Sequence, residues 1–376
     1  MAKKLKFLFL EPFFGGSHRD FAEGLVAHSR HSIDLVTLPA RFWKWRMRGA
    51  AITFARKIGS LKGYDGLVLT DLMSLADFKA LMPPPFPPSL VYFHENQLTY
   101  PLAPGERMDY QFGFTGLTTA LAATRILFNS HFHKDAFFDQ MPAFLNMMPE
   151  YVPGWTVDTI RERSAVCYPG CHFPMELTMP EDRASIPLII WNHRWEFDKN
   201  PDGFFAALQT LVEKGVAFEL AILGENFQAV PKAFIRAREQ FNDRIRQYGY
   251  EAKRDDYEGW LRQGHVVVST AEQENFGIAI VEAIRWGCFP ILPKRLVYPE
   301  IIPEVFHKDC LYNSHKDMVD KLYLLLTEGS PRRDQRMKLS EAMAKFSWDT
   351  VIEAYDEELE KLASGEVNWN LSQNPL

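Results

Sequence analysis

Residues 188–223 read LIIWNHRWEFDKNPDGFFAALQTLVEKGVAFELAIL, and this stretch decides the fold. The apolar run Leu188–Asn192 predicts a buried strand, and Gly203–Lys214 has the spacing of a helix. Phe218–Leu223 predicts a second strand, which ends at Gly224. Strands that alternate with helices in this way form a parallel sheet with helices on both faces. The stretch therefore predicts an α/β fold.

The same alternation extends over most of the chain. At 376 residues the chain is longer than one core of about 250–300 residues supports. A boundary is expected in Pro149–Pro187, which is rich in Pro and Gly and lacks a long periodic segment. We therefore expect two Rossmann-like domains, residues 1–180 and 181–349, that face a central cleft and bind ligands beyond the carboxyl ends of their strands. The other expected strands and helices are Lys6–Leu10, His18–His28, Ile33–Leu38, Gly66–Leu69, Leu90–His94, Arg125–Asn129, Val266–Ser269, Phe276–Trp286 and Phe289–Leu292.

Composition excludes several classes of protein. With 47% hydrophobic and 24% charged residues the chain is globular, and its net charge of -6 argues against a protein that coats nucleic acid. The longest uncharged stretch of note, Tyr110–Thr124, is shorter than the about 20 apolar residues of a membrane helix, so no integral membrane segment is expected. Cys167, Cys171 and His172 lack a fourth zinc ligand at suitable spacing, which favours buried thiols in a reducing cytoplasm and no metal site.

The segment Glu274–Glu282 (ENFGIAIVE) is the strongest functional signal. Asn275 is a suitable N-cap, so the backbone amides of Phe276 and Gly277 would lie at the start of a helix. Together with the helix dipole these amides would form an anion site for a diphosphate. Glu274 and Glu282 would hold hydroxyl groups at the two ends of a nucleotide sugar. Taken alone, the segment also fits an ordinary helix with two unconnected glutamates.

Two cations lie in the loop after the strand Leu188–Asn192. Arg194 and Lys199 are predicted at the carboxyl end of that strand, where two fixed positive charges would neutralise a departing diphosphate. The alternative is a pair of ordinary surface charges. The chain contains no Asp-x-Asp sequence, the usual signal for a metal-bound diphosphate, and this favours chemistry without a metal.

These motifs together resemble family 4 of the GT-B glycosyltransferases. Arg194 and Lys199 are similar to the family's Arg-x4-Lys pair, Glu274–Glu282 to its Glu-x7-Glu signature, and Gly15-Gly16 to its N-terminal glycine loop. Residues 346–348 (FSW) resemble the start of its closing helix, which at about residues 350–365 would return to the N-terminal domain. The resemblance implies a retaining transferase that needs no metal and no cofactor beyond its donor substrate.

A narrower resemblance lies in the N-terminal half. The segments Glu11–His18 (EPFFGGSH), Tyr92–Pro101 (YFHENQLTYP) and Phe128–Phe137 (FNSHFHKDAF) resemble the tRNA-queuosine α-mannosyltransferase family. Members of that family transfer mannose from GDP-mannose to queuosine in the anticodon of aspartate tRNA. The resemblance therefore implies GDP-mannose as donor and tRNA as partner.

The two resemblances imply a role for each candidate residue. In a front-face displacement, Arg194 and Lys199 stabilise the leaving phosphate, Glu274 orients the hexose and Glu282 the ribose. His94 matches the family's histidine near the sugar, with a histidine held in a loop as the alternative. These implied roles make His94, Arg194, Lys199 and Glu274 the catalytic candidates, and the donor-binding candidates are Gly16, Gly224, Asn275, Phe276, Gly277 and Glu282.

An RNA acceptor requires positive charge, and the segment Arg41–Arg48 (RFWKWRMR) is the best basic patch. Cations that alternate with aromatic residues suit phosphates and unstacked bases. The alternative is an amphipathic segment that packs Trp43 and Trp45 on the core, with its cations extended into solvent. The acceptor candidates are Arg41, Lys44, Arg46 and Arg48 in this patch, and Glu95, Asn96 and Gln97 beside His94.

Three other functions remain open at this point. The same chemistry could act on a lipid or polysaccharide acceptor, or the protein could be a non-catalytic nucleotide-sugar-binding module. A nicotinamide dehydrogenase is disfavoured because no G-x-G-x-x-G follows a strand. For the transferase, we expect Glu274→Ala and Lys199→Ala each to abolish most turnover without unfolding the chain.

Overall fold

The computed structural model describes residues 4–102, 105, 107–173, 184–225, 230–328 and 333–365. The chain divides into two compact units. Unit 1 comprises Met1–His172 and Trp348–Leu376, and unit 2 comprises Phe173–Ser347. The boundary expected between residues 180 and 181 lies outside the described residues.

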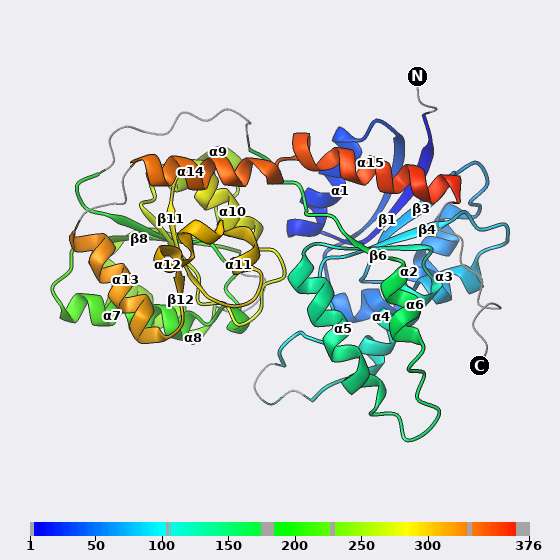
Figure 1. The fold of residues 1–376 in the computed structure, drawn as a ribbon, viewed down its shortest axis with the longest axis horizontal. Helices are drawn as coiled ribbons and strands as arrows, with labels where there is room; N and C mark the ends of the chain where they lie inside the picture. Colours follow the sequence, from blue (N-terminus) through cyan, green and yellow to red (C-terminus); the bar gives the residue numbers. More distant parts are fainter. Residues whose placement is uncertain are drawn as a thin grey trace. The chain divides into compact units, whose positions relative to one another are not determined.

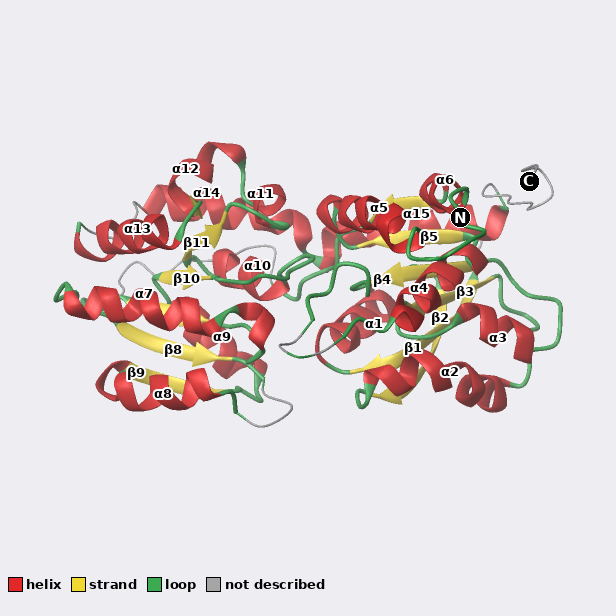
Figure 2. Ribbon diagram, turned by 90° about the horizontal axis from the view of Figure 1, so that it is seen from below, coloured by secondary structure: helices red, strands yellow, loops and turns green. Residues whose placement is uncertain are grey.

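Unit 1 is built on a parallel sheet with helices on both faces (Figures 1 and 2). Its described strands follow the order β2-β1-β3-β4-β5-β6, so the chain crosses over between β2 and β3. Almost every residue of the central strands is apolar and buried, as a sheet covered on both faces requires. The strands are β1 (Lys6–Phe14), β2 (Ser32–Pro39), β3 (Gly66–Thr70), β4 (Ser89–Phe93), β5 (Arg125–Phe128) and β6 (Ser164–Val166); the helices are α1 (Gly16–His28), α2 (Trp43–Ile58), α3 (Leu75–Leu81), α4 (Tyr110–Ala122), α5 (His131–Leu145), α6 (Thr156–Glu162) and α15 (Trp348–Ser364).

Two features of unit 1 were not indicated by the sequence. The stretch Pro149–Pro187 contains α6 and β6, and β6 completes the sheet by pairing with β5. A helix of seven residues and a strand of three are too short to give a periodic pattern, which explains why the sequence did not indicate them. β1 also continues past Leu10 to Phe14, and it thereby places the carboxylate of Glu11 inside the unit, with no exposed surface.

The helix predicted at about residues 350–365 is α15, and it packs beside α1 on the sheet of unit 1 (Figure 1). Its first residue, Trp348, is 2% exposed and lies against two glycines. A Cβ atom on Gly24 or Gly170 would lie 2.1 or 2.2 Å from the indole ring, so neither position accepts a side chain. The helix α15 is therefore an integral part of the core of unit 1.

Unit 2 repeats the architecture with a second parallel sheet, whose described strands have the order β12-β11-β10-β7-β8-β9 (Figure 2). β7 and β10 are neighbours at its centre, so the loops that follow them lie side by side. The strands are β7 (Leu188–Trp191), β8 (Glu219–Leu223), β9 (Ile245–Gly249), β10 (Val266–Val268), β11 (Phe289–Pro293) and β12 (Leu311–Tyr312); the helices are α7 (Pro201–Glu213), α8 (Lys232–Gln240), α9 (Arg254–Gln263), α10 (Ile278–Arg285), α11 (Tyr298–Ile301), α12 (His307–Cys310), α13 (His315–Thr327) and α14 (Arg333–Met343).

Within the described ranges, no helix combines the length and the apolar character needed to span a bilayer. The thiols of Cys167, Cys171, Cys288 and Cys310 are all free and buried, as expected for cysteines that serve as small apolar side chains.

Candidate functional site

The site in unit 2 is formed where the loop after β7 is joined to the loop after β10. The carbonyl oxygen of Asp198 accepts a hydrogen bond of 2.7 Å from the backbone amide of Glu272. The hydroxyl of Thr270 donates to the carbonyl oxygens of Lys199 and Asn200, at 2.9 and 2.8 Å. These bonds fix the backbones that carry the Lys199 and Glu274 side chains.

Asn200 ends the first of these loops and begins α7. It adopts a left-handed conformation with φ 50°, which Asn tolerates better than most residues. Its side-chain oxygen accepts from the amide of Gly203 at 3.0 Å and caps the helix, and Pro201 occupies the first helical position. The sequence Lys-Asn-Pro thus stops the loop directly after Lys199.

Lys199 is buried, in contrast to the surface cation that was the alternative. Its Nζ donates to the carbonyl oxygen of Gln273 at 2.6 Å and lies 3.1 Å from Asp198 Oδ2 and 3.4 Å from Glu274 Oε2. Burial alone would lower the pKa of Lys199, but Glu274 and Asp198 outweigh it and raise this pKa. Two hydrogen bonds and an ion pair thus hold the ammonium group in place, and Lys199 acts on a ligand through its charge.

Arg194 lies closer to solvent than Lys199. Its side chain is 46% exposed, and the guanidinium lies 3.3 Å from Glu196 Oε2. The charge of Arg194 also lowers the pKa of Lys199, so the two cations predicted from the sequence affect one another. Lys199 is thus a fixed internal charge, and Arg194 is a surface charge.

The start of α10 differs from the expectation. The helix begins at Ile278, its N-cap is Gly277 with φ 84°, and Asn275 is not the cap. A residue with positive φ cannot lie inside a right-handed helix, so Gly277 fixes the start of α10 two residues later than the sequence suggested. Asn275 instead accepts a hydrogen bond of 3.2 Å from the side chain of Gln273. The first amides of the helix are therefore those of Ile278 and the residue after it.

Phe276 and Gly277 shape the turn between Glu274 and α10. Phe276 is 3% exposed and packs its ring against Phe346 at 5.1 Å. A Cβ atom on Gly277 would lie 3.4 Å from Cγ of Glu274, so the glycine leaves room for that side chain to fold over the helix start. Gly277 therefore lies directly beside Glu274, and Phe276 packs the same turn against Phe346.

Glu282 belongs to a buried polar network. It is 5% exposed, and its carboxylate lies 2.7 Å from Arg254 Nη2 and accepts from the Tyr257 hydroxyl at 3.2 Å. The amide of Asn192 donates to the same hydroxyl at 3.1 Å and to the carbonyl oxygen of Ala279 at 2.7 Å. The network connects the end of β7 to α10 and fixes the carboxylate of Glu282 between them.

Gly224 joins the loop after β8 to the loop after β7. Its φ is 131°, and a Cβ atom there would lie 2.0 Å from the carbonyl oxygen of His193. The backbone of Glu225 accepts from the amide of Trp195 at 3.1 Å, which holds the two loops together. The predicted donor-binding glycine therefore permits a close backbone approach within the site.

In unit 1, His94 lies in a cluster with Glu11 and His18. The rings of His94 and His18 are 3.9 Å apart between centroids, and His18 Nδ1 lies 3.3 Å from Glu11 Oε1. Burial and then Glu11 act in opposite directions on His18, and the net effect raises its pKa. Burial, and then the charge of His18, hold the pKa of His94 well below its usual range. His94 is therefore a neutral imidazole at neutral pH.

This cluster also has the geometry of a possible metal-ligand group. Among the described residues, Glu11, His18 and His94 form the one set of such side chains whose ligand atoms all lie within 4.8 Å of one another. Neighbouring ligands of a tetrahedral zinc ion lie about 3.3 Å apart, given bonds of about 2.0 Å. In the present arrangement the three side chains are instead joined by an ion pair and a ring contact.

The polar residues beside His94 have separate roles. Asn96 is 3% exposed, and its side-chain oxygen accepts from the amides of Leu98 and Thr99 at 3.0 Å each, which closes a turn. Glu95 and Gln97 are half-buried. Gly16 adopts φ 51° and has open space where a side chain would be, so it leaves the start of α1 accessible. Of these candidates, Asn96 has a clear structural function.

The predicted basic patch forms the exposed face at the start of α2. Trp43 is half-buried and packs on Phe112 at 5.3 Å, but Phe42 and Trp45 are each 75% exposed. The alternative in which both tryptophans pack on the core is therefore wrong for Trp45. The four basic candidates are Arg41 and Lys44, both exposed, Arg46, which donates to the Pro39 carbonyl, and Arg48, which donates to Gln111.

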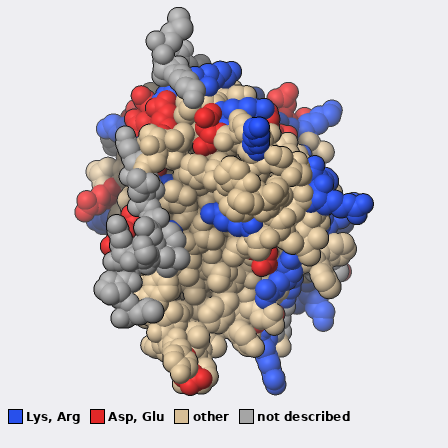
Figure 3. Space-filling model, turned by 90° about the vertical axis from the view of Figure 1, so that its right-hand side faces the viewer, with Lys and Arg blue, Asp and Glu red and all other residues tan. Residues whose placement is uncertain are grey.

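On one face of the molecule the charged side chains are scattered rather than continuous. Figure 3 shows one face on which Lys and Arg are more frequent toward the right-hand side, with wide uncharged areas between them. Such a distribution is consistent with the net charge of -6 and with binding at a local patch.

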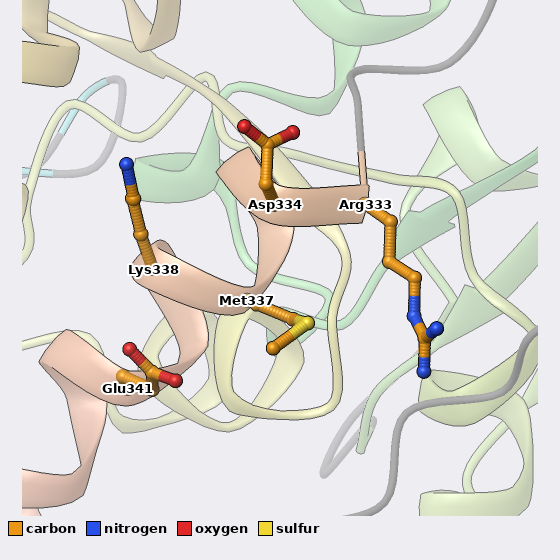
Figure 4. A pocket seen from close by; sticks show the side chains of 5 residues that line it. All are labelled: Arg333, Asp334, Met337, Lys338 and Glu341. Atoms are coloured by element: carbon orange, nitrogen blue, oxygen red, sulfur yellow. The ribbon is translucent and has the colours of Figure 1, made fainter.

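Unit 2 also has a surface hollow on α14 (Figure 4). None of the candidate residues contributes to this hollow, which is lined by Arg333, Asp334, Met337, Lys338 and Glu341.

Several functional groups were missed by sequence reasoning. His193, Tyr257 and Arg254 contribute to the site in unit 2, and Glu11 and His18 surround His94. A detectable signal existed for His193, which follows a strand end in the same way as Arg194. No comparable signal marks Arg254, whose contact with Glu282 depends on the packing of α9 against α10.

The fold and the site define a class of protein. Two parallel-sheet units in one chain, with a buried Lys–Glu pair at a helix start in the second unit, are the features of a GT-B glycosyltransferase. Residues 183–346 match the family model "Glycosyl transferases group 1". A sucrose-phosphate synthase from Thermosynechococcus elongatus has a similar fold, with a TM-score of 0.69 and 13% identity over 96% of this chain and 100% of that one. The catalytic domain of starch synthase IV from Arabidopsis thaliana gives 0.67 and 11%, with the same coverage of 96% and 100%.

The family can be stated more narrowly. Residues 6–171 match the model of the tRNA-queuosine alpha-mannosyltransferase N-terminal domain. A tRNA-queuosine alpha-mannosyltransferase from Drosophila melanogaster is 36% identical over 327 residues, which cover 84% of this chain and 85% of the fly protein. The chain belongs to the tRNA-queuosine α-mannosyltransferase family.

Proposed function

We propose that the protein transfers mannose from GDP-mannose to queuosine in tRNA, with retention of the sugar's anomeric configuration. The observation that carries the proposal is the buried contact between Lys199 and Glu274 at the start of α10, in a chain of this family. An internal ammonium and a helix start supply positive charge for a diphosphate. The neighbouring carboxylate supplies an acceptor for sugar hydroxyl groups.

The residues of unit 2 account for leaving-group stabilisation. As the bond between the anomeric carbon and the phosphate oxygen breaks, negative charge develops on the diphosphate. Lys199 and Arg194 offset this charge, and the leaving oxygen takes the proton of the attacking acceptor hydroxyl. We assign no metal ion to this step. Glu282, held by Arg254 and Tyr257, is the candidate for the ribose of the nucleotide.

Unit 1 supplies candidate groups for the acceptor. We retain His94 as a catalytic candidate, because a neutral imidazole can donate or accept a hydrogen bond at neutral pH. The exposed Phe42 and Trp45, with Arg41 and Lys44 beside them, suit unstacked bases and phosphates of a tRNA. A tRNA acceptor favours a cytoplasmic location.

A direct assay tests the proposal. The protein is incubated with queuosine-containing tRNA and, in separate reactions, with GDP-mannose and other nucleotide hexoses, and digested nucleosides are analysed by mass. We expect one added hexose on queuosine from GDP-mannose, removable by an α-mannosidase, and none on tRNA that carries guanosine at that position. Absence of added hexose with every donor would contradict the proposal.

Replacing Trp45 by alanine tests the acceptor surface. Stacking of one base on an aromatic side chain contributes about 1–3 kcal/mol, so we expect the KM for tRNA to rise about tenfold or more while the KM for the donor stays unchanged. Val305→Ala, which removes a 78% exposed apolar side chain from unit 2, is the matched control. An unchanged KM for tRNA in the Trp45 variant would remove this surface from the proposal.

A further inference from the structure

His193 is a buried imidazole beside Glu274 that the proposed mechanism does not use. Its side chain is 2% exposed, and Nδ1 lies 4.0 Å from Glu274 Oε2. The ring is held edge-on to Trp191, with 5.2 Å between centroids, and the carbonyl oxygen of His193 lies against Gly224. The position of the imidazole is therefore fixed from two sides.

The protonation of this ring follows from its surroundings. Burial lowers the pKa of His193 to about 3, with the charge of Lys199 acting in the same direction, so the ring is neutral at neutral pH. Nε2 is buried and has no hydrogen-bond partner among the described residues. An orphan acceptor is tolerated better than an orphan N–H, which places the single proton on Nδ1, the atom directed toward Glu274.

The separation of 4.0 Å between Nδ1 and Oε2 is too long for a direct hydrogen bond. It is suited to one hydroxyl oxygen placed between the two atoms. If the oxygen lay about 2.8 Å from each atom, the angle Nδ1–O–Oε2 would be about 90°. This angle is close to that between the proton and a lone pair of a hydroxyl group. That hydroxyl would accept from His193 Nδ1 and donate to Glu274 Oε2, so both of its hydrogen-bonding capacities would be used.

Lys199 does not compete for this hydroxyl. Its Nζ donates to the carbonyl oxygen of Gln273 and to Glu274 Oε2, and it forms an ion pair with Asp198 at 3.1 Å. Glu274 is 18% exposed on its side chain, so a ligand reaches the carboxylate from solvent. The pair His193–Glu274 is therefore one neutral donor and one charged acceptor at the entrance to a buried charge cluster.

We propose that His193 is a sugar-binding, specificity-determining residue, which together with Glu274 holds one hydroxyl of the hexose that is transferred. The inference rests on the proposed function, because it takes the ligand of unit 2 to be a nucleotide sugar. A hexose in which this hydroxyl is absent or inverted leaves the imidazole N–H and the carboxylate without their shared partner. A site with unmatched buried polar groups rejects such a ligand strongly.

Two variants separate the hydrogen bond from the shape of the side chain. The substitution H193N is the conservative variant, because the amide of asparagine keeps an N–H near the place of Nδ1, and H193L removes the donor. Binding of GDP and of GDP-mannose is measured by calorimetry for wild type, H193N and H193L. We expect GDP to bind equally in all three, and the gain in affinity from GDP to GDP-mannose to fall about tenfold in H193L only.

Analogues of GDP-mannose that lack single hydroxyl groups identify the contact. We expect one analogue to bind wild type and H193N more weakly than GDP-mannose does, and to lose clearly less affinity for H193L, since one of the two partners of the missing hydroxyl is already absent there. Equal gains from GDP to GDP-mannose in wild type and H193L, or additive losses with every analogue, would overturn the role of His193. Wild type that binds GDP-mannose no better than GDP would instead refute the proposed donor.

Discussion

Replacing Lys199 by methionine is expected to lower kcat about a thousandfold and also to destabilise unit 2. Removal of one preorganised charge or donor from a leaving-group site typically costs about 100- to 1000-fold in rate. Asp198 has no exposed surface, and its carboxylate lies 3.1 Å from the Lys199 ammonium. Loss of one partner from a buried ion pair lowers the free energy of unfolding by about 3–5 kcal/mol, because a charge is left uncompensated. Denaturant unfolding and steady-state kinetics measure the two effects.

The double variant Asp198→Asn/Lys199→Met separates stability from activity. Neutralising Asp198 removes the uncompensated internal charge, so we expect the double variant to regain most of the lost unfolding free energy. Turnover should stay low, because the positive charge at the leaving group is still missing. A double variant that regained stability and turnover together would show that Lys199 has only a structural role.

The predicted loss of stability differs from the expectation drawn from the sequence. From the sequence, with Lys199 in a loop at a strand end, Lys199→Ala was expected to abolish most turnover without unfolding the chain. The structure shows that Lys199 lies between Asp198 and Glu274, and Glu274 is 75 residues away in the chain. Residues so far apart meet because β7 and β10 are neighbours in the sheet. Strand order cannot be derived from local periodicity, so the burial of Lys199 could not be predicted.

Elements with strong local signals were predicted well. The apolar runs that became β3 and β7 and the amphipathic pattern of α7 are local features, so their types followed from the sequence alone. The start of α10 was misplaced because Asn275 and Gly277 are both acceptable helix boundaries. Backbone conformation at Gly277, which depends on the packing of Glu274 and Tyr298 around it, decides between them.

The exposure of surface residues is a second feature that the sequence did not determine. The segment Arg41–Arg48 contains the same residue types whether its tryptophans face the core or the solvent. Contact of Trp43 with Phe112 sets the orientation of α2 and leaves Trp45 exposed. Phe112 lies on α4, so the outcome depends on tertiary packing that the segment itself does not encode.

Replacing Glu274 by glutamine is expected to lower kcat/KM about a hundredfold and to leave the fold intact. The substitution removes the negative charge but keeps the size of the side chain, and it replaces a charge-assisted hydrogen bond to the sugar by a weaker neutral one. Lys199 keeps its contacts with Asp198 and with the carbonyl oxygen of Gln273, so its charge stays compensated. The free energy of unfolding should therefore change far less than in the Lys199 variant.

Glu272→Gln is the matched control for this variant. Glu272 lies two residues earlier in the same loop and its side chain is exposed, so its substitution makes the same change of charge away from the buried cluster. We expect wild-type kcat/KM for the control. Binding of GDP should be equal in both variants, because in the proposed mechanism the carboxylate of Glu274 acts on the hexose while the charges of Lys199 and Arg194 act on the diphosphate. If Glu274→Gln instead turned over at the rate of its control, the hexose would have to be held by other groups, and the role of the Lys199–Glu274 pair would reduce to an internal ion pair.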